Sequence, residues 1–338
     1  SRQLEVDSAL TLGREDTDVI VEDPQISRRH AVLRPADGSV SVEDLGSLNG
    51  TWVNGRRITA PVRLSVGDMV KFGETVLELL GGRGLAALTV PAMQILPVVV
   101  GRDLARQYSQ GDTTVHALRG VSVDIAAGRL TAVMGPSGSG KSTMMHILAG
   151  LDRPTSGTVQ LAGTEITTLD DRKLTELRRE RIGFIFQFFN LLPMLTAEAN
   201  IALPLSIAGK KPDPELLEEL IERLGLGDRR NHRPAQMSGG EQQRVAIARA
   251  FISKPAVVFA DEPTGNLDST TGQEILELMR QFVGTYGQTT VMVTHDPHAA
   301  AVADRILFLA DGDIVNDLGP STAKEILEAM DEISSPRR

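Results

Sequence analysis

The chain has 338 residues, of which 41% are apolar and 23% are charged. A chain of this length usually divides into two or three domains, and this composition is ordinary for a folded globular protein. The net charge of -9, without a long basic run, argues against binding of nucleic acid, and the absence of cysteine excludes disulfides and thiolate metal sites.

The first 80 residues have the pattern of an all-β region, with short β-type runs separated by Gly, Asp and Asn turns. Examples of such runs are residues 31–33, 40–42 and 75–79. Because Asn and Gly tolerate positive φ, Asn54-Gly55 predicts a two-residue hairpin. Residues 1–10 lack the continuous apolar core of a signal peptide, so we expect a protein that stays in the cytoplasm.

Residues 81–96 are expected to form a linker, because Gly, Ala and Pro break the strand pattern there. The most apolar stretch, residues 85–100, is interrupted by Pro91, Gln94 and Pro97. It falls short of the roughly 20 apolar residues that a membrane-spanning helix needs. We therefore expect no segment that crosses a membrane.

Strands and helices alternate beyond residue 97, which is the order of an α/β domain. Strands are predicted at residues 130–134, 256–260 and 289–294, and a helix opens after Gly140. A helix-rich insertion separates the first two strands, and one of its helices lies within residues 213–225, capped by Asp, started by Pro and ended by Gly. We expect this domain to cover residues 97–320, followed by a C-terminal helix and tail at residues 321–338.

A phosphate-binding loop is predicted between the first of these strands and its helix, where residues 135–142 read Gly-Pro-Ser-Gly-Ser-Gly-Lys-Ser. In this motif the loop amides converge on the β-phosphate, Lys141 bridges the β- and γ-phosphates, and the Ser142 hydroxyl ligates Mg²⁺. The pattern alone is also compatible with a Gly-Ser turn before a helix. The nucleotide-binding residues expected here are Gly135, Ser137, Gly138, Ser139, Gly140, Lys141, Ser142 and Thr143.

Two adjacent acids, Asp261 and Glu262, end the apolar run at residues 256–260. Strand ends are where sites collect in α/β proteins, and alone such a pair is also typical of a solvated turn. Beside a phosphate loop, Asp261 is expected to hold Mg²⁺ and Glu262 to polarise the attacking water as general base.

Residues 238–244, Ser-Gly-Gly-Glu-Gln-Gln-Arg, follow the pattern of a capping box at the start of a helix over residues 242–251. With the two preceding motifs they resemble the signature sequence of ABC-type ATPases, here beginning Met-Ser where Leu-Ser is commoner. The resemblance implies an α/β P-loop NTPase with a RecA-like core, an antiparallel β subdomain and a helical subdomain. It also implies that Ser238, Gly239 and Gly240 close over the γ-phosphate held by a second copy of the chain.

Four further residues stand in the order that this family implies. By resemblance Gln187 contacts Mg²⁺ and the water and relays to a membrane partner, and Asp268 organises the dimer contact. His295 is expected to hydrogen-bond the γ-phosphate and so to act with Glu262, Lys141 and Gln187 in catalysis. Tyr108 falls where an aromatic ring stacks on adenine, although an aromatic residue there is also compatible with simple packing.

Residues 151–157, 188–193 and 260–268 resemble the ATPases of lipoprotein-release and macrolide-export systems. In that subgroup ATP closure does mechanical work on a permease with four transmembrane helices. The resemblance implies ATP and Mg²⁺ as ligands, a separate permease as partner, and a peripheral location on the inner face of the cell membrane.

The N-terminal region resembles a forkhead-associated (FHA) domain, a β-sandwich that reads phosphothreonine. The resemblance rests on residues 12–14, 26–31, 46–51, 67–68 and 72–73. It implies that Arg14, Ser27 and Arg28 contact the phosphate, that Asn49 holds the peptide backbone, and that His30 and Gly50 stabilise the loops. Leu48 stands where many such domains have Thr, which removes one hydroxyl contact, and a sandwich that no longer binds phosphate is the alternative.

These motifs and patterns together predict a multidomain chain, an all-β sandwich followed by an ABC-type ATPase. The expected function is an ATPase that dimerises around two ATP molecules, drives a separate permease and is regulated through a phosphothreonine-containing protein. One alternative is a soluble ABC protein of DNA repair or translation, but the long coiled coils or second cassette of that class are absent from the sequence. Another is a signalling adaptor that binds nucleotide without a transport role.

Overall fold

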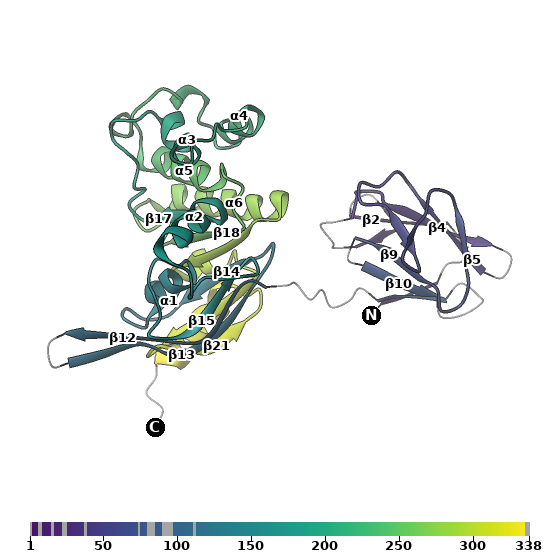
Figure 1. Cartoon of the computed structure of the whole chain (residues 1–338), viewed down its shortest axis with the longest axis horizontal. Coiled ribbons are helices and arrows are strands. Elements are labelled where there is room, and N and C mark those ends of the chain that lie inside the picture. The colour runs from purple at the N-terminus through teal and green to yellow at the C-terminus, as the bar shows by residue number, and fades with distance from the viewer. Residues whose placement is uncertain are drawn as a thin grey trace. The chain divides into compact units, whose positions relative to one another are not determined.

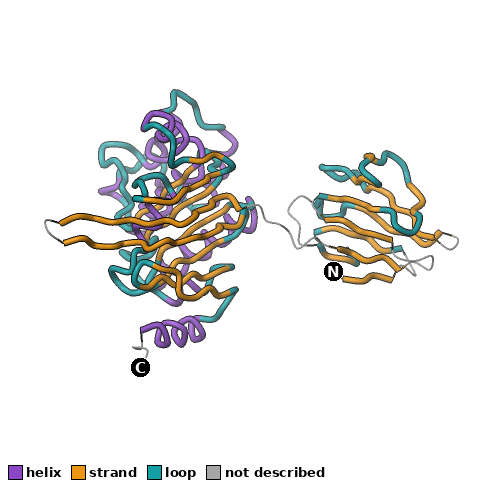
Figure 2. Tube along the Cα trace, turned by 60° about the horizontal axis from the view of Figure 1, so that its bottom comes forward, coloured by secondary structure: helices purple, strands orange, loops and turns teal. Residues whose placement is uncertain are grey.

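The computed structural model describes residues 2–5, 9–14, 17–21, 26–36, 39–73, 75–79, 85–89, 97–110 and 113–334. The chain forms two compact units, Ser1–Leu96 and Pro97–Arg338 (Figure 1). The first unit is built of strands, and the second combines strands with helices (Figure 2). Within the described parts of the chain, no helix combines the length and the apolar character of a membrane span.

The N-terminal unit packs two sheets against each other. One has the strand order β1-β11-β10-β9-β6-β7 and the other β3-β2-β4-β5-β8. The strands are β1 Arg2–Glu5, β2 Leu10–Gly13, β3 Val19–Ile20, β4 Ala31–Ala36, β5 Ser39–Asp44, β6 Thr51–Val53, β7 Arg56–Arg57, β8 Val62–Leu64, β9 Met69–Phe72, β10 Thr75–Leu79 and β11 Leu85–Thr89. The predicted all-β sandwich is confirmed.

Alternation of side chains along these strands builds the core of the sandwich. Val70 and Phe72 on β9 are buried, whereas Met69 and Lys71 on the same strand are exposed. The predicted hairpin is confirmed, because Asn54 and Gly55 join β6 to β7 with φ of 48° and 77°. Both values suit the right-handed twist of the flanking strands.

Strand β11 lies inside the segment that we expected to be a linker, so that prediction is wrong for residues 85–89. β11 pairs antiparallel with both β10 and β1 and extends the first sheet. Sequence reasoning took Gly and Pro content as the end of the sandwich. A short apolar run forms a strand when two neighbouring strand edges offer hydrogen-bond partners, and those neighbours are set by tertiary structure.

The second unit, which we call the cassette, is built on a sheet with the order β17-β18-β19-β14-β20-β21 and a smaller antiparallel sheet β13-β12-β15-β16. Neighbouring strands from β17 to β20 run parallel, and β21 is antiparallel to β20. The strands are β12 Pro97–Gln110, β13 Thr113–Ala126, β14 Leu130–Met134, β15 Ser156–Leu161, β16 Thr164–Glu165, β17 Ile182–Phe186, β18 Val257–Asp261, β19 Thr289–Val293, β20 Arg305–Ala310 and β21 Asp313–Leu318. The predicted strands at residues 130–134, 256–260 and 289–294 match β14, β18 and β19 within one residue at each end.

The helices of the cassette cover this sheet and form a helix-rich insertion between β17 and β18 (Figure 1). They are α1 Lys141–Leu148, α2 Asp171–Arg181, α3 Ala197–Ile207, α4 Pro214–Arg223, α5 Gly239–Phe251, α6 Ser269–Tyr286, α7 Pro297–Ala300 and α8 Ala323–Ser334. The caps predicted for α4 are confirmed: the Asp213 side chain accepts from the Glu215 N–H, and Gly225 has φ of 64°. α5 begins earlier than the predicted residue 242, because Ser238 already caps it.

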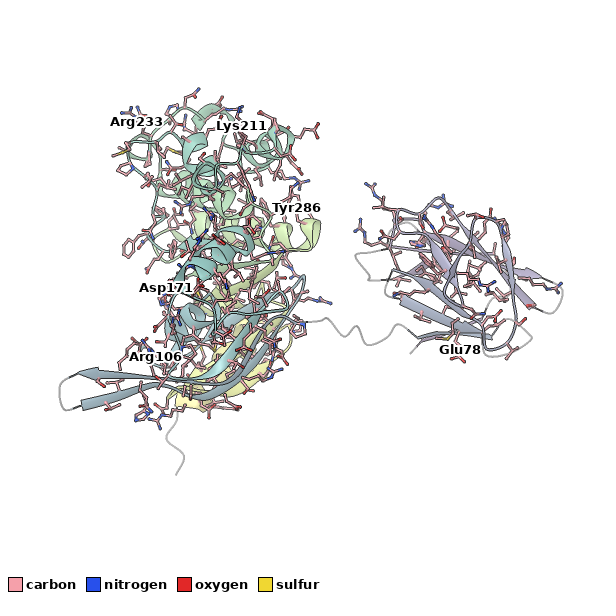
Figure 3. All side chains as sticks on the ribbon, in the orientation of Figure 1. Glu78, Arg106, Asp171, Lys211, Arg233 and Tyr286 are labelled. Atoms are coloured by element: carbon pink, nitrogen blue, oxygen red, sulfur yellow. The ribbon has the colours of Figure 1, made fainter. Side chains whose placement is uncertain are left out.

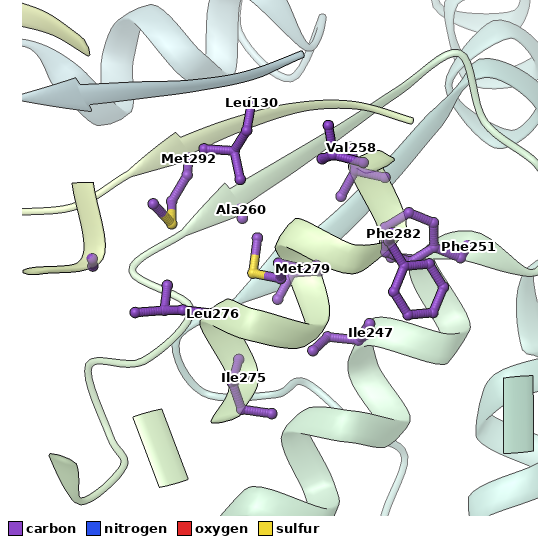
Figure 4. Packing of buried hydrophobic residues seen from close by; sticks show 14 of the residues in the cluster. Leu130, Ile247, Phe251, Val258, Ala260, Ile275, Leu276, Met279, Phe282 and Met292 are labelled. Atoms are coloured by element: carbon purple, nitrogen blue, oxygen red, sulfur yellow. The ribbon is translucent and has the colours of Figure 1, made fainter. Parts of the chain in front are cut away.

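The strands of the parallel sheet are buried on both faces, which explains their continuous apolar runs. Met279 and Phe282 of α6 reach toward β14, β18 and β19 in the larger of the two cores (Figure 4). The Phe251 and Phe282 rings lie 4.2 Å apart between centroids, which ties α5 to α6. Each large apolar side chain buried in this way stabilises the fold by about 1.5–3 kcal/mol.

Candidate functional sites

Four chain segments that carry predicted site residues leave the parallel sheet at the same edge. The register pairs Asp261 with both Phe186 and Val293, and Val133 with Val293. Because these strands are parallel, their carboxyl ends meet at one edge of the sheet. Gln187, Glu262, His295 and the phosphate loop all follow directly from those ends.

The phosphate loop connects β14 to α1 through glycines in conformations that other residues rarely adopt. Gly135 has φ of 144°, and a Cβ there would lie 2.0 Å from the Leu309 carbonyl oxygen. Gly140 caps α1 with φ of 105°. Lys141 Nζ donates to the Gly135 and Pro136 carbonyls at 2.9 and 2.8 Å. The other predicted loop residues are Ser137, Gly138 and Ser139 in the loop and Ser142 and Thr143 in the first turn of α1.

The charges at this edge influence one another. Burial lowers the pKa of the Lys141 ammonium, and the carboxylates of Glu262 and Asp261 oppose that shift. Burial also raises the pKa of Asp261, and the charge of Glu262 adds to it, whereas His146 and Lys141 oppose it. Sites that shift pKa values through burial and specific charges are typical of function.

Glu262 has a strained backbone and a defined partner. Its φ of 45° is left-handed, which is unusual for a residue other than glycine. Its N–H donates to the Val293 carbonyl at 2.9 Å, and its Oε1 lies 2.9 Å from Nδ1 of His295. The structure thus brings together the two side chains that the sequence predicted to act on the γ-phosphate and the water.

Gln187 is in contact with the loop that follows β18. The Asn266 side chain donates to the Gln187 carbonyl at 2.9 Å. A Cβ at Gly265 would lie 2.8 Å from Gln187 Nε2. In the sequence, Asn266 was noted only as part of the motif at residues 260–268. Its contact with Gln187 could not be predicted, because the two loops are far apart in the sequence.

The predicted Mg²⁺ ligands are all oxygen donors, namely the Ser142 hydroxyl, the Gln187 amide oxygen and the Asp261 carboxylate. Mg²⁺ prefers such hard donors and keeps part of its shell for water and substrate phosphates. The described residues contain no cluster of three or more His, Cys, Asp or Glu side chains suited to a metal. Three hard oxygen donors of this kind fit an ion that completes its shell with water and nucleotide phosphates.

Ser238 caps α5 in the helix-rich insertion. Its hydroxyl accepts from the Glu241 N–H at 3.2 Å, and the Glu241 carboxylate accepts from the Ser238 N–H at 2.7 Å. The predicted capping box is confirmed. Gly239 and Gly240 form the first turn, and a Cβ at Gly240 would lie 2.5 Å from Thr271 Cγ2.

Asp268 caps the next helix, α6. Its carboxylate accepts from the backbone N–H and the hydroxyl of Thr271, at 3.0 and 2.7 Å, and these bonds lower the pKa of Asp268. Since Thr271 also contacts Gly240, the caps of α5 and α6 lie side by side within one chain. This shared contact was not visible in the sequence.

Tyr108 lies on β12, where its ring contacts Arg106 and its hydroxyl contacts Asp152. The Arg106 guanidinium stands 4.6 Å from the centre of the Tyr108 ring, and Arg106 is labelled in Figure 3. The Tyr108 hydroxyl and the Arg106 side chain both donate to Asp152, at 2.8 and 2.9 Å. Asp152 and Arg106 are partners that sequence reasoning missed, because β12 and residue 152 are joined only through the fold.

In the N-terminal unit, the predicted phosphothreonine-binding residues lie on three loops, and hydrogen bonds to Ser27 join the other two loops to its own. The Arg14 N–H donates to the Ser27 carbonyl at 3.1 Å. The Leu48 N–H donates to the Ser27 hydroxyl at 3.1 Å, so the residue that departs from the family pattern binds through its backbone. Arg28 follows Ser27 with an exposed side chain, and Asn49 follows Leu48.

His30 is fully buried beneath these loops. Its Nδ1 accepts from the Ser27 N–H at 3.2 Å, and its Nε2 lies 3.3 Å from the Gly50 carbonyl. Nε2 therefore carries the proton in this network. The ring joins the loop of Ser27 to the loop of Asn49, as expected for a residue that stabilises the loops.

Asp44 stabilises the turn that leads to Asn49, a role that was not predicted from the sequence. Its carboxylate accepts from the N–H groups of Gly46 and Ser47 and from the hydroxyls of Ser47 and Thr51, at 2.6–2.9 Å. This network shapes the turn that leads to Asn49. An Asp two residues before Gly is a turn signal that sequence inspection could have used.

Comparison with known proteins gives two family matches and close relatives. The ABC transporter family model matches residues 118–265, and the FHA domain model matches residues 10–73. The macrolide export ATP-binding/permease protein MacB of Escherichia coli strain K12 is 49% identical over 223 residues, which is 65% of this chain and 34% of that protein. The chain thus spans about a third of the length of the curated relatives that it matches.

Solved structures match over nearly their full length. The dimeric, post-hydrolysis structure of the ATP-binding cassette MJ0796 bound to ADP and Pi is 41% identical with a TM-score of 0.61, and the match covers 66% of this chain and 99% of that one. The cbiO1 subunit from Clostridium perfringens, part of the cbiONQ transporter complex, is 26% identical with a TM-score of 0.60, over 70% of this chain and 92% of that one. From the motifs, the fold and these matches, this chain belongs to the ABC transporter family and is an ATP-hydrolysing cassette preceded by an FHA domain.

Proposed function

We propose that this chain works as a head-to-tail pair that hydrolyses two ATP molecules and drives a separate membrane-embedded permease, with the FHA domain binding a phosphothreonine protein. The observation that carries the ATPase part is the meeting of four strand ends at one sheet edge. That arrangement puts Lys141, Asp261, Glu262 and His295 within one site. The solved dimeric cassette with ADP and Pi supports the pairing.

Each residue at the sheet edge has a role in this proposal. The loop amides and Lys141 hold the phosphates, and Glu262 takes a proton from the attacking water while His295 orients Glu262 and contacts the γ-phosphate. Mg²⁺, held by Ser142, Gln187 and Asp261, supplies charge neutralisation at the phosphate oxygens when bound. Tyr108 stacks on the adenine ring.

The second copy completes the site. Ser238, Gly239 and Gly240 lie at the start of α5, where unpaired N–H groups and the helix dipole favour an anion. We assign that anion as the γ-phosphate held by the phosphate loop of the other copy. Asp268 keeps the cap of α6 beside the cap of α5, which orders the surface where the two copies meet.

The permease partner is supported by exposed apolar side chains beside Gln187. Phe188 and Met194 are 73% and 72% exposed, which is unusual for side chains of this size. The Escherichia coli relative MacB is named as an ATP-binding/permease protein, so its name joins a permease to the cassette. Through such a partner the cassette would lie on the inner face of the cell membrane.

The FHA part of the proposal rests on the cations at the loop tips. Arg14 and Arg28 are exposed beside the partly buried Ser27, and a phosphate offers close to two negative charges and three acceptor oxygens. Asn49, on the neighbouring loop, holds the backbone of the bound peptide. The ligand is a phosphothreonine segment of another protein or of a second copy.

The ATPase mechanism is tested with Glu262→Gln in the full chain. The amide keeps the size of the side chain but cannot take a proton, so kcat should fall by about a hundredfold or more while ATP binding persists. Turnover that survives this change would refute the assigned general base. If the unaltered chain binds ATP with Mg²⁺ and never hydrolyses it, with or without a permease, the signalling-adaptor alternative holds instead.

The FHA role is tested by titrating the full chain with matched phosphothreonine and unphosphorylated peptides. The fluorescence of Trp52, the only tryptophan of the chain, reports on this unit. Arg14→Ala should abolish binding of the phosphorylated peptide because it removes a charge-assisted contact. Equal binding of both peptides by the unaltered chain would rule out phosphate recognition.

A further inference from the structure

Arg249 makes two short hydrogen bonds that no motif explains. It lies near the end of α5, and its Nη1 and Nη2 donate to the carbonyls of Asn190 and Phe189 at 2.6 and 2.7 Å. These two residues belong to the loop that follows Gln187. Two bonds from one guanidinium to successive carbonyls fix both the position and the orientation of that loop.

The loop bound in this way has an unfavourable backbone. Phe189 and Asn190 have φ of 59° and 52°, both in the left-handed region that is costly for residues with a side chain. Two such residues in succession persist only where surrounding contacts hold them. The carbonyls that Arg249 binds are those of these two residues.

Arg249 is also half-buried, which has a cost for a charged group. Burial lowers the pKa of its guanidinium, and no charged group among the described residues contributes to that shift. A half-buried cation without a carboxylate partner is stabilised when other acceptors replace the water that it has lost. Here the strained loop supplies them, so the cation and the loop depend on each other.

The same loop contacts the opposite end of α5. A Cβ at Gly239 would lie 3.7 Å from Cζ of Phe189, which places the Phe189 ring against the first turn of the helix. Phe189 is therefore fastened to α5 at both ends, through its ring near Ser238 and through its carbonyl at Arg249. Gln187, two residues earlier, lies at the sheet edge.

We propose that Arg249 is a positioning residue that clamps residues 188–190 onto α5, so that Gln187 at the sheet edge and Ser238 at the helix cap move as one unit during turnover. The inference rests on the proposed function, because it assigns how two parts of that site are coupled. Arg249 donates to the carbonyls of the loop and is not among the residues that we assign to nucleotide binding. Its effect passes through the backbone of the loop.

The first test is Arg249→Lys in the full chain, which keeps the charge but loses the two-pronged donor. We expect kcat to fall by about tenfold or more while the KM for ATP changes by less than about twofold, because misplacement of Gln187 affects turnover and the phosphate loop is untouched. Hydrogen exchange of residues 186–192 should rise about tenfold, a readout that does not depend on activity.

The second variant adds Asn190→Gly, since glycine adopts the left-handed conformation without strain. If the clamp serves to hold that backbone, Asn190→Gly should restore much of the kcat and the exchange protection lost in Arg249→Lys. A merely structural role of Arg249 in the packing of α5 would not be rescued from the loop side.

The matched control is Arg178→Lys on α2. Arg178 also donates to a carbonyl, that of Gly150 at 2.8 Å, but that left-handed residue is a glycine and needs no clamp. The control should keep kcat within about twofold. Unchanged kcat and exchange in Arg249→Lys, no rescue by Asn190→Gly, or an equal loss in the control would each overturn the proposal. An unaltered chain that does not hydrolyse ATP would instead refute the proposed function, and the exchange measurement would still decide whether the clamp exists.

Discussion

The cassette and the FHA unit hold their candidate sites by different physical means. In the cassette, parallel strands bring the site residues to one edge, and Gly135 of the phosphate loop is packed against the backbone of β20. In the FHA unit, His30 joins two of the loops that carry the site, and Asp44 holds the turn that leads to Asn49. The nucleotide site of the cassette is therefore held rigid by the sheet, whereas the loop site of the FHA unit depends on a few buried polar groups.

Gly135→Ala tests whether the sheet holds the phosphate loop rigid, and it should have the largest effect. The new Cβ would meet the Leu309 carbonyl of β20 and impose strain at φ of 144°, so the free energy of unfolding of the cassette should fall by about 4 kcal/mol. Denaturant unfolding followed by circular dichroism measures it. Gly138→Ala is the control, because no atom lies within 4 Å of its Cβ and only backbone strain of about 1 kcal/mol is expected. Equal losses in the two variants would show that the sheet does not set the shape of the loop.

A smaller decrease in the free energy of unfolding is expected from His30→Ala in the FHA unit. The change leaves the Ser27 N–H and the Gly50 carbonyl without their shared partner, which should destabilise this unit by about 2 kcal/mol. Trp52 fluorescence during denaturation reports on this unit alone, since the chain has no other tryptophan. ATP turnover of the same variant is the control and should not change. A loss of binding without a loss of stability would mean that His30 contacts the ligand.

The smallest expected effect is a pH dependence that comes from Asp44. Burial opposes it, but the hydrogen bonds from Ser47, Thr51 and Gly46 prevail and hold the pKa of Asp44 below its ordinary value. A depressed folded pKa contributes stability above the unfolded pKa of about 3.9, and that contribution is lost as pH falls through the folded pKa. Asp44→Asn should cost about 1 kcal/mol at pH 7, and the gap to the unaltered chain should close below about pH 4. A gap that stays constant with pH would show that the charge of Asp44 is not involved.

The sequence predicted the two folds and the cassette motifs because those features are local. Asn54-Gly55, the apolar run of β14 and the cap of α4 each carry their own physical signal. β11 was predicted to be linker, because its place in the sheet depends on pairing with β1, about 80 residues earlier in the sequence, as well as with β10. The same reason explains the missed contacts of Arg249, Asn266 and Asp152, which join residues 44 or more positions apart.

The residue roles at the sheet edge were predicted by resemblance, and the structure adds geometry to them. The left-handed Glu262 and its contact with His295 have no signature in the sequence. The lowered pKa of Lys141 and the raised pKa of Asp261 arise from burial that only the fold creates. The backbone strain and the pKa shifts at this edge therefore required the structure, whereas the residues expected there could be named from the sequence.

Mixing two inactive variants shows whether each ATP is held by Lys141 of one copy and Ser238 of another. Lys141→Ala and Ser238→Arg should each hydrolyse no ATP alone. In a mixed pair, one of the two sites regains an intact Lys141 facing an intact Ser238. If each site is shared between two copies, mixing should restore ATP turnover. A mixture that forms mixed dimers but stays as inactive as its two components would contradict this arrangement.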